Sequence, residues 1–121
     1  MTTQEVANQY YELARQSKWI DIQDGLYDGQ VLSREPEHVA SRGVQVITKG
    51  REALKAKGTA HRAMIEAVHS QYCSEPLVAG NFFSVVLKRE VTYKNQARME
   101  TEEIGVFEVK DGKVVSEQFF Y

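Results

Sequence analysis

The stretch that decides the fold is METEEIGVFEVKDGKVVSEQFFY, residues 99–121. Two runs rich in β-branched and aromatic residues flank the turn signal KDG, a pattern typical of a β-hairpin. We expect a three-residue loop in which Gly112 adopts a left-handed conformation and a bulge follows. In that register Val109 faces Lys113, and alternate side chains along each strand share one face of the sheet.

Counting outward from this turn places a mostly apolar row on one face of the hairpin. The predicted pairs are Phe107 with Val115, Gly105 with Glu117, Glu103 with Phe119, and Thr101 with Tyr121. The opposite face includes Ile104, Val106 and Phe120 among polar residues. This mixture suits a partly covered surface through which a homodimer forms.

The hairpin upstream, around YKNQA at residues 93–97, extends the same apolar face. Three loop residues would place Leu87 opposite Glu103, whereas two loop residues would place Lys88 there. We expect the first arrangement, because it gathers the apolar residues of three strands on one side. The face would then continue through Leu77, Cys73, Gln71 and His69.

The first half of the chain is predicted to be largely helical. Thr2 and Glu5 form a capping-box pattern that begins a helix running to about Ser17. A second, shorter helix contains Trp19 and Ile22, and it ends near Gly25 and the turn pattern at residues 28–29.

A third helix is predicted through residues 50–64, with Thr48 as its cap. The β-rich pieces at residues 29–35 and 43–47 look like a peripheral hairpin, and four long strands follow from Ile65 onward. Helices followed by strands predict an α+β domain with helices on one face of an antiparallel sheet. We expect a single domain over residues 1–121.

Composition narrows the functional classes. The chain has 121 residues, a formal net charge of −2, and no clustered basic stripe, so nucleic acid is not an expected partner. No apolar run approaches the roughly 20 residues that span a bilayer, and the polar start does not resemble a signal peptide. We therefore expect a soluble, cytoplasmic protein that does not bind membranes.

Metal and disulfide chemistry are not expected either. Cys73 is the only cysteine, which excludes an intrachain disulfide and the common thiolate metal sites. His38, His61 and His69 lack the i, i+4 spacing of a helical metal pair. Neither a metal nor another cofactor is predicted.

With these residues in hand, the chain resembles the SnoaL-like branch of the nuclear-transport-factor-2-like (cystatin-like α+β) superfamily over nearly its whole length. The segments that resemble it are QYYELARQSKWIDIQDGLYDG (9–29), KGREAL (49–54), EPLVAGNFFSVVLKREVTY (75–93) and the opening stretch at 99–121. The resemblance implies three helices packed on a strongly curved mixed or antiparallel sheet, forming a cone with an internal apolar pocket. It also implies homodimers packed through the convex sheet face.

Relatives of this kind include polyketide cyclases, ketosteroid isomerases and limonene epoxide hydrolases. The resemblance implies that a strand carboxyl near Glu103 does acid and base work, and that Glu35 lies roughly where an isomerase general base sits. Gly105 occupies the alternative strand position without a side chain. The tyrosine of an isomerase oxyanion hole matches either Tyr10 or Tyr11.

The residues themselves support Glu103 as the first candidate. A glutamate held between Leu87 and Phe119 loses hydration, which should raise its pKa toward neutral pH. The alternative is a buried ion pair between Glu103 and Arg89 or Lys88. His69 could exchange a proton with a carbonyl substrate, or it could simply line the pocket.

Glu35 and Glu117 are weaker acid/base candidates. The predicted pocket wall comprises Tyr10, Trp19, Leu87, Arg89, Gly105, Phe107, Glu117, Phe119 and Tyr121. One hypothesis is a cofactor-independent isomerase or cyclase that acts on an apolar carbonyl compound, with Glu103, His69 and Glu35 as catalytic groups. The other is a non-catalytic ligand-binding or dimerisation module.

Overall fold

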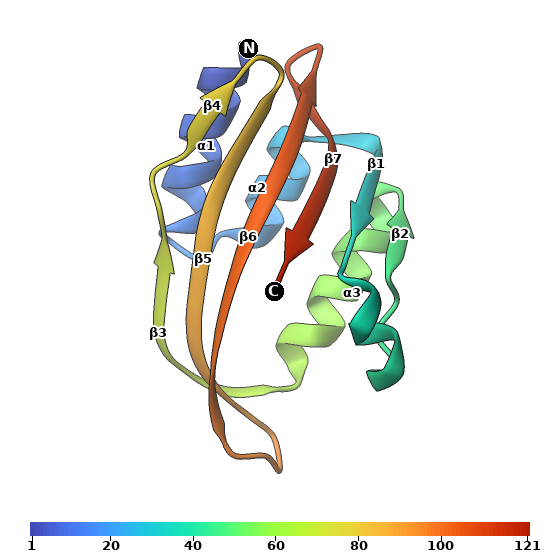
Figure 1. Cartoon of the computed structure of the whole chain (residues 1–121), viewed down its shortest axis with the longest axis vertical. Coiled ribbons are helices and arrows are strands. Elements are labelled where there is room, and N and C mark those ends of the chain that lie inside the picture. Colours follow the sequence, from blue (N-terminus) through green and yellow to red (C-terminus); the bar gives the residue numbers. More distant parts are fainter.

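The computed structural model of the protein describes residues 1–121 and shows helices packed against one sheet (Figure 1). The helices are α1 (Thr3–Ala14), α2 (Trp19–Leu26), the 3₁₀ helix η1 (Glu37–Arg42) and α3 (Arg51–Ala63). The strands are β1 (Tyr27–Arg34), β2 (Ile47–Lys49), β3 (Ile65–Cys73), β4 (Leu77–Ala79), β5 (Phe82–Tyr93), β6 (Arg98–Lys110) and β7 (Lys113–Phe120). The predicted α+β class is confirmed. None of these helices is both long and apolar enough to cross a membrane.

The capping box at the start of α1 is formed as predicted. The Glu5 amide donates to the Thr2 hydroxyl at 3.1 Å, and the Thr2 amide donates to the Glu5 carboxylate at 2.9 Å. The predicted cap of α3 is wrong, because Thr48 lies buried in β2 and the N-cap is Gly50 at φ 94°. That backbone conformation favours glycine, and no side chain caps the helix there.

The sheet is mixed, with strand order β2-β1-β7-β6-β5-β3 and β4 beside β5. Its pairs are antiparallel except for β1 with β7, which run parallel. The predicted peripheral hairpin is therefore only partly right: β1 does pair with β2, but β1 also joins the sheet alongside β7. Residues 28–29, expected as a turn, lie within β1.

The hairpin registers decide which side chains face the helices. Leu87 lies opposite Glu103, so the preferred register of the β5–β6 hairpin is confirmed. The last turn differs from the prediction, because Lys110 pairs with Lys113 and both Asp111 (φ 51°) and Gly112 (φ 76°) are left-handed. A two-residue turn with two positive φ values is the type I′ geometry.

This shorter turn shifts the β6–β7 pairs. Phe107 lies opposite Glu117 and Gly105 opposite Phe119, with the extra residue Val115 in a bulge of β7. Because the net shift is two residues, Glu117 and Phe119 keep the predicted face. Glu103 lies beyond the paired end of β7, so its expected pairing with Phe119 is not formed.

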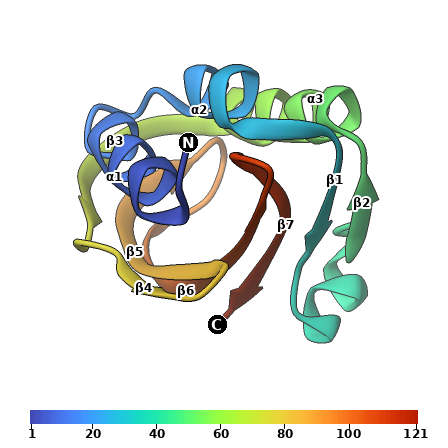
Figure 2. The same ribbon diagram turned by 90° about the horizontal axis from the view of Figure 1, so that it is seen from above.

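The core lies between α1 and the concave side of the sheet. Seen from above, the sheet bends around α1 while remaining open at its two edges (Figure 2). The ring of Tyr10 packs on Phe83 and Phe107, with ring centroids 5.6 Å and 4.6 Å apart, and Phe83 stacks on Phe107 at 4.7 Å. These ring contacts hold Tyr10 in place on the concave side of the sheet.

The upstream end of the concave face differs from the prediction at two residues, Leu77 and His69. Cys73 lies opposite Leu87 and Gln71 opposite Arg89, as the predicted face requires. Leu77, however, pairs with Ser84 on the uncovered side and is 77% exposed, while Val78 packs against the core instead. The break at residues 74–76 between β3 and β4 reverses the alternation there.

Candidate functional site

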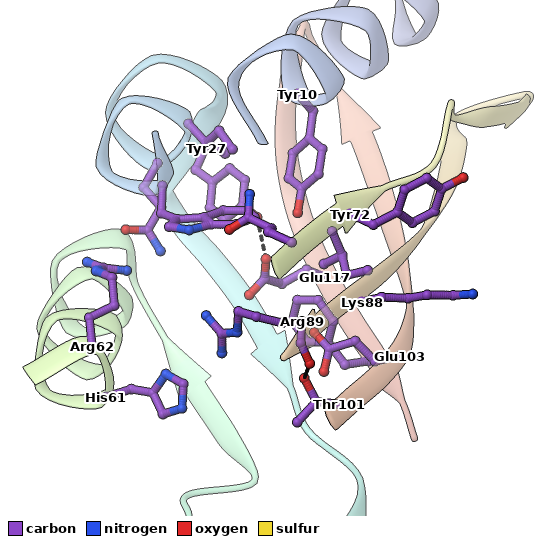
Figure 3. Close-up of a pocket in the computed structure, with 16 residues that line it drawn as sticks. Tyr10, Tyr27, His61, Arg62, Tyr72, Lys88, Arg89, Thr101, Glu103 and Glu117 are labelled. Carbon is purple, nitrogen blue, oxygen red and sulfur yellow. Dashed lines mark hydrogen bonds between the residues drawn. The ribbon is translucent and has the colours of Figure 1, made fainter. Parts of the chain in front are cut away.

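A cavity of about 180 Å³ lies between the helices and the concave side of the sheet (Figure 3). Helices α1, α2 and α3 supply one side of its wall, and strands β3, β5, β6 and β7 supply most of the other. The residues that line it are Tyr10, Trp19, Ile22, Gln23, Tyr27, His61, Arg62, Gln71, Tyr72, Leu87, Lys88, Arg89, Thr101, Glu103, Glu117 and Phe119. The wall therefore combines an apolar part with both acidic and basic side chains.

Glu117 is a buried carboxylate held by two hydroxyls of β1. The Tyr27 hydroxyl donates to one carboxylate oxygen, and the Ser33 hydroxyl donates to the other at 2.7 Å. Burial raises the pKa of Glu117, although both hydrogen bonds act in the opposite direction. These hydrogen bonds connect β1 to β7 on the concave side of the sheet. Tyr27 and Ser33 were not predicted, because the sequence does not indicate that β1 lies beside β7.

Glu103 lies on β6 and faces the same cavity. Burial is the largest cause that raises the pKa of Glu103, to about 7; the charges of Glu35 and Glu117 also raise it, and that of Arg89 lowers it. No cation lies within 4 Å of this carboxyl: Lys88 instead pairs with Glu102 at 3.4 Å. The ion-pair alternative is therefore not formed, and burial shifts the pKa of Glu103 in the predicted direction.

Tyr10 brings a phenolic hydroxyl to the cavity from α1. Its ring is almost fully buried, and Figure 3 shows the hydroxyl pointing into the cavity. Burial raises the pKa of Tyr10 well above its ordinary value, and the charge of Glu117 raises it further. The hydroxyl therefore stays protonated and can donate a hydrogen bond. Tyr11, the other tyrosine considered, packs beneath the guanidinium of Arg15 and does not line the cavity.

Three cationic or ionisable groups occupy the side of the cavity next to α3. His61 and Arg62 come from the last turn of α3, and Arg89 comes from β5. The imidazole Nε2 of His61 lies 2.9 Å from the Tyr93 hydroxyl. Burial lowers the pKa of His61, and the charges of Arg89 and Arg62 lower it further. Only Arg89 of these three was predicted, because the orientation of α3 over the sheet is not a local property.

His69 does not lie in the cavity. It is the extra residue of a bulge in β3, between the pairs Val68–Val91 and Ser70–Glu90. Its side chain is exposed, and its Nε2 lies 2.8 Å from the Thr92 hydroxyl. The bulge removes His69 from the alternation that the sequence analysis assumed, so its predicted place on the concave face is wrong.

Glu35 and Tyr121 lie together outside the cavity wall. The Tyr121 hydroxyl donates to the Glu35 carboxylate at 2.8 Å, and Lys57 Nζ lies 3.7 Å from the same group. Tyr121 is not among the residues that line the cavity, so its predicted place in the pocket wall is wrong. Glu35 nevertheless lies close enough for its charge to raise the pKa of Glu103.

Gly105 and Phe107 belong to the core behind the cavity, not to its wall. Phe107 is fully buried, and a Cβ at Gly105 would lie 3.0 Å from that ring and 3.1 Å from the ring of Phe119. No group of three or more His, Cys, Asp or Glu side chains is arranged to hold a metal ion. The remaining predicted wall residues, Tyr10, Trp19, Leu87, Arg89, Glu117 and Phe119, do line the cavity.

The sequence and the fold of this chain are both similar to those of known proteins. The family model described as a SnoaL-like domain matches residues 1–121. The crystal structure of a candidate SnoaL-like polyketide cyclase from Mesorhizobium loti is 30% identical, with a TM-score of 0.91 and full coverage of both chains. No curated protein gives a significant match.

Two more distant structures show the same fold. TerC, co-crystallised with polyporic acid, is 18% identical with a TM-score of 0.78, over 98% of this chain and 90% of that one. IdmH, a candidate polyketide cyclase from Streptomyces antibioticus, is 12% identical with a TM-score of 0.73, over 99% of this chain and 91% of that one.

Proposed function

The chain belongs to the SnoaL-like family, and on that premise we propose that it is a cofactor-independent isomerase or cyclase for a small carbonyl compound. Glu103 is the group that moves the proton. The cavity on the concave side of the sheet is the reaction site. It corresponds to the interior of the cone that the family resemblance implies. The polyketide-cyclase description of the Mesorhizobium loti relative and the ligand-bound state of TerC support a small-molecule site in this fold.

The observation that supports this proposal most strongly is the setting of the Glu103 carboxyl. It faces a cavity, lies beside Leu87, and has no cationic partner within 4 Å. A carboxyl in such a setting is poised both to accept and to donate a proton near neutral pH. A carboxylate serving only as a structural partner would be expected to have its ion pair or its hydrogen bonds, as Glu117 does.

The proposed chemistry balances without an added reagent. The Glu103 carboxylate takes a proton from the carbon next to the substrate carbonyl. The electron pair of that C–H bond forms a C=C bond, and the π pair of the carbonyl moves onto its oxygen. The Tyr10 hydroxyl donates a hydrogen bond to the resulting enolate oxygen. In an isomerisation Glu103 returns the proton to another carbon. In a cyclisation the enolate carbon attacks a second carbonyl, and Glu103 protonates the new alkoxide.

Hydrogen–deuterium exchange at carbon tests this function directly. The protein is incubated in D₂O with a panel of small cyclic and aromatic ketones and keto acids, and exchange is followed by NMR. We expect wild type to exchange the proton next to the carbonyl of at least one compound, and Glu103→Gln to lose that exchange. Glu102→Gln is the matched control, because Glu102 is an exposed neighbour on the opposite face, paired with Lys88.

The outcomes separate the two functional hypotheses. Equal exchange in wild type and Glu103→Gln would contradict the role of Glu103. Saturable binding of a compound without exchange in any variant would favour the non-catalytic ligand-binding alternative.

A further inference from the structure

The basic side of the cavity takes no direct part in the proton transfer described above, although the charge of Arg89 lowers the pKa of Glu103. The guanidinium of Arg89 points from β5 toward α3, where Arg62 and His61 face the same space (Figure 3). These groups interact electrostatically, because the charge of Arg89 lowers the pKa of both Arg62 and His61. Like charges that approach one another in a partly desolvated wall destabilise the fold unless an anion offsets them.

The protein itself supplies no such anion within contact distance. Its ion pairs use other cations, namely Arg15, Lys55, Lys57, Lys88 and Arg98. The side chain of Arg62 has one long hydrogen bond, 3.4 Å to the Thr59 hydroxyl, and no carboxylate lies within 4 Å of either Arg62 or Arg89. Two guanidinium groups with free donors are well suited to a planar carboxylate.

We propose that Arg62, Arg89 and His61 form an anion subsite, and that the ligand of the cavity is a small organic acid. Its carboxylate lies at the α3 side, its apolar ring packs against Trp19, Ile22 and Leu87, and its reactive carbon faces Glu103. This inference rests on the proposed function only in treating the cavity as the ligand site.

The size of the cavity suits an acid of one or two rings. At about 180 Å³ it is slightly larger than an engineered cavity of about 150 Å³ that holds benzene, and smaller than the roughly 300–1,000 Å³ of drug-sized sites. A monocyclic or bicyclic acid fits this volume.

Binding of 1-naphthoate and of its neutral analogue 1-naphthamide tests the subsite, by isothermal titration calorimetry on the full chain. We expect 1-naphthoate to bind at least tenfold more tightly than the amide. Arg62→Gln and Arg89→Gln should each weaken 1-naphthoate binding at least tenfold, and Arg89→Lys should restore part of it. Arg98→Gln is the control, because Arg98 pairs with Glu90 at 2.7 Å outside the cavity.

Equal affinity for acid and amide would overturn the inference, and so would unchanged binding by folded Arg62→Gln and Arg89→Gln variants. Inorganic phosphate that binds as tightly as 1-naphthoate would overturn the assignment to an organic acid. Glu103→Gln separates this inference from the proposed function, since it should keep 1-naphthoate binding while losing proton exchange. Acid-selective binding with no exchange in any variant would leave the subsite standing and refute the enzyme.

Discussion

Burial raises the pKa of Glu103 in the folded state, so the free energy of unfolding depends on pH. Its pKa is raised from the ordinary 4.5 to about 7, so between these values the folded state holds a proton that the unfolded chain has lost. The stabilisation that comes from protonated Glu103 is fully present below pH 4.5 and is lost as pH rises through 7. Ionised Glu103 therefore destabilises the fold at pH 8.

Glu103→Gln removes this penalty. Each pKa unit corresponds to about 1.4 kcal/mol, and partial exposure reduces the effect, so we expect the variant to gain about 1–3 kcal/mol at pH 8. At pH 4.5 wild type and variant should unfold at similar denaturant concentrations. Urea unfolding at the two pH values measures the difference, with Glu102→Gln as the control. A variant less stable than wild type at pH 8 would contradict the conclusion that the Glu103 carboxylate has no cationic partner.

Gly105 is required by the packing of two aromatic rings. A Cβ there would lie 3.0 Å from the ring of Phe107, which is fully buried and stacked on Phe83. Because that ring cannot move aside, we expect Gly105→Ala to lower the free energy of unfolding by about 1–3 kcal/mol. Gly25→Ala is the control, since nothing lies within 4 Å of its added methyl group. In helix α2 that change should be neutral or stabilising.

At the scale of single elements, the parallel contact of β1 with β7 depends on the hydroxyls that bind Glu117. Tyr27→Phe removes one donor from a buried carboxylate, which raises the pKa of Glu117 further. We expect a loss of about 1–3 kcal/mol at pH 8 and a smaller loss at pH 5, because the protonated acid needs the donor less.

Thermal unfolding of Tyr27→Phe at both pH values measures this effect. Tyr11→Phe is the matched control, because Tyr11 packs beneath Arg15 on α1 and not against Glu117. A loss at pH 5 as large as that at pH 8 would show that Tyr27 acts through packing alone.

The elements also show how far the sequence predicts this fold. Alternation and turn residues correctly placed Leu87 opposite Glu103, because a hairpin register is a local property. The bulges at His69 and Val115 were not predicted, because neither strand contains a glycine or proline that marks the position of the extra residue. His69 was therefore assigned to the wrong side of the sheet.

The same limit applies to the candidate site. Glu103 was found because an acidic residue in an apolar row is visible in the sequence. His61, Arg62 and Tyr27 reach the cavity only through the packing of α3 and β1 against distant strands, which no local pattern encodes. The basic side of the cavity was accordingly missed, except for Arg89.

At the scale of the whole molecule, one side of the sheet has no helix over it, as both views of the ribbon show (Figures 1 and 2). Strand pairing places four large apolar side chains on that side, on β4, β5, β6 and β7. They are Leu77 (77% exposed), Phe82 (49%), Ile104 (48%) and Phe120 (50%). Exposed apolar residues gathered on one face of a sheet are typical of a protein–protein interface.

We propose that this face joins two copies of the chain, and we expect multi-angle light scattering at tens of micromolar to give the mass of a dimer. Ile104→Glu places a charge on this face, where it must be desolvated on association, so it should give a monomer that remains folded. Met64→Glu is the control, because Met64 is equally exposed (53%) but follows α3, away from this face. A wild-type monomer at that concentration, or a dimer that survives Ile104→Glu, would refute the interface. Because Glu103 faces the opposite side of β6 from Ile104, proton exchange in the monomeric variant should match that of wild type.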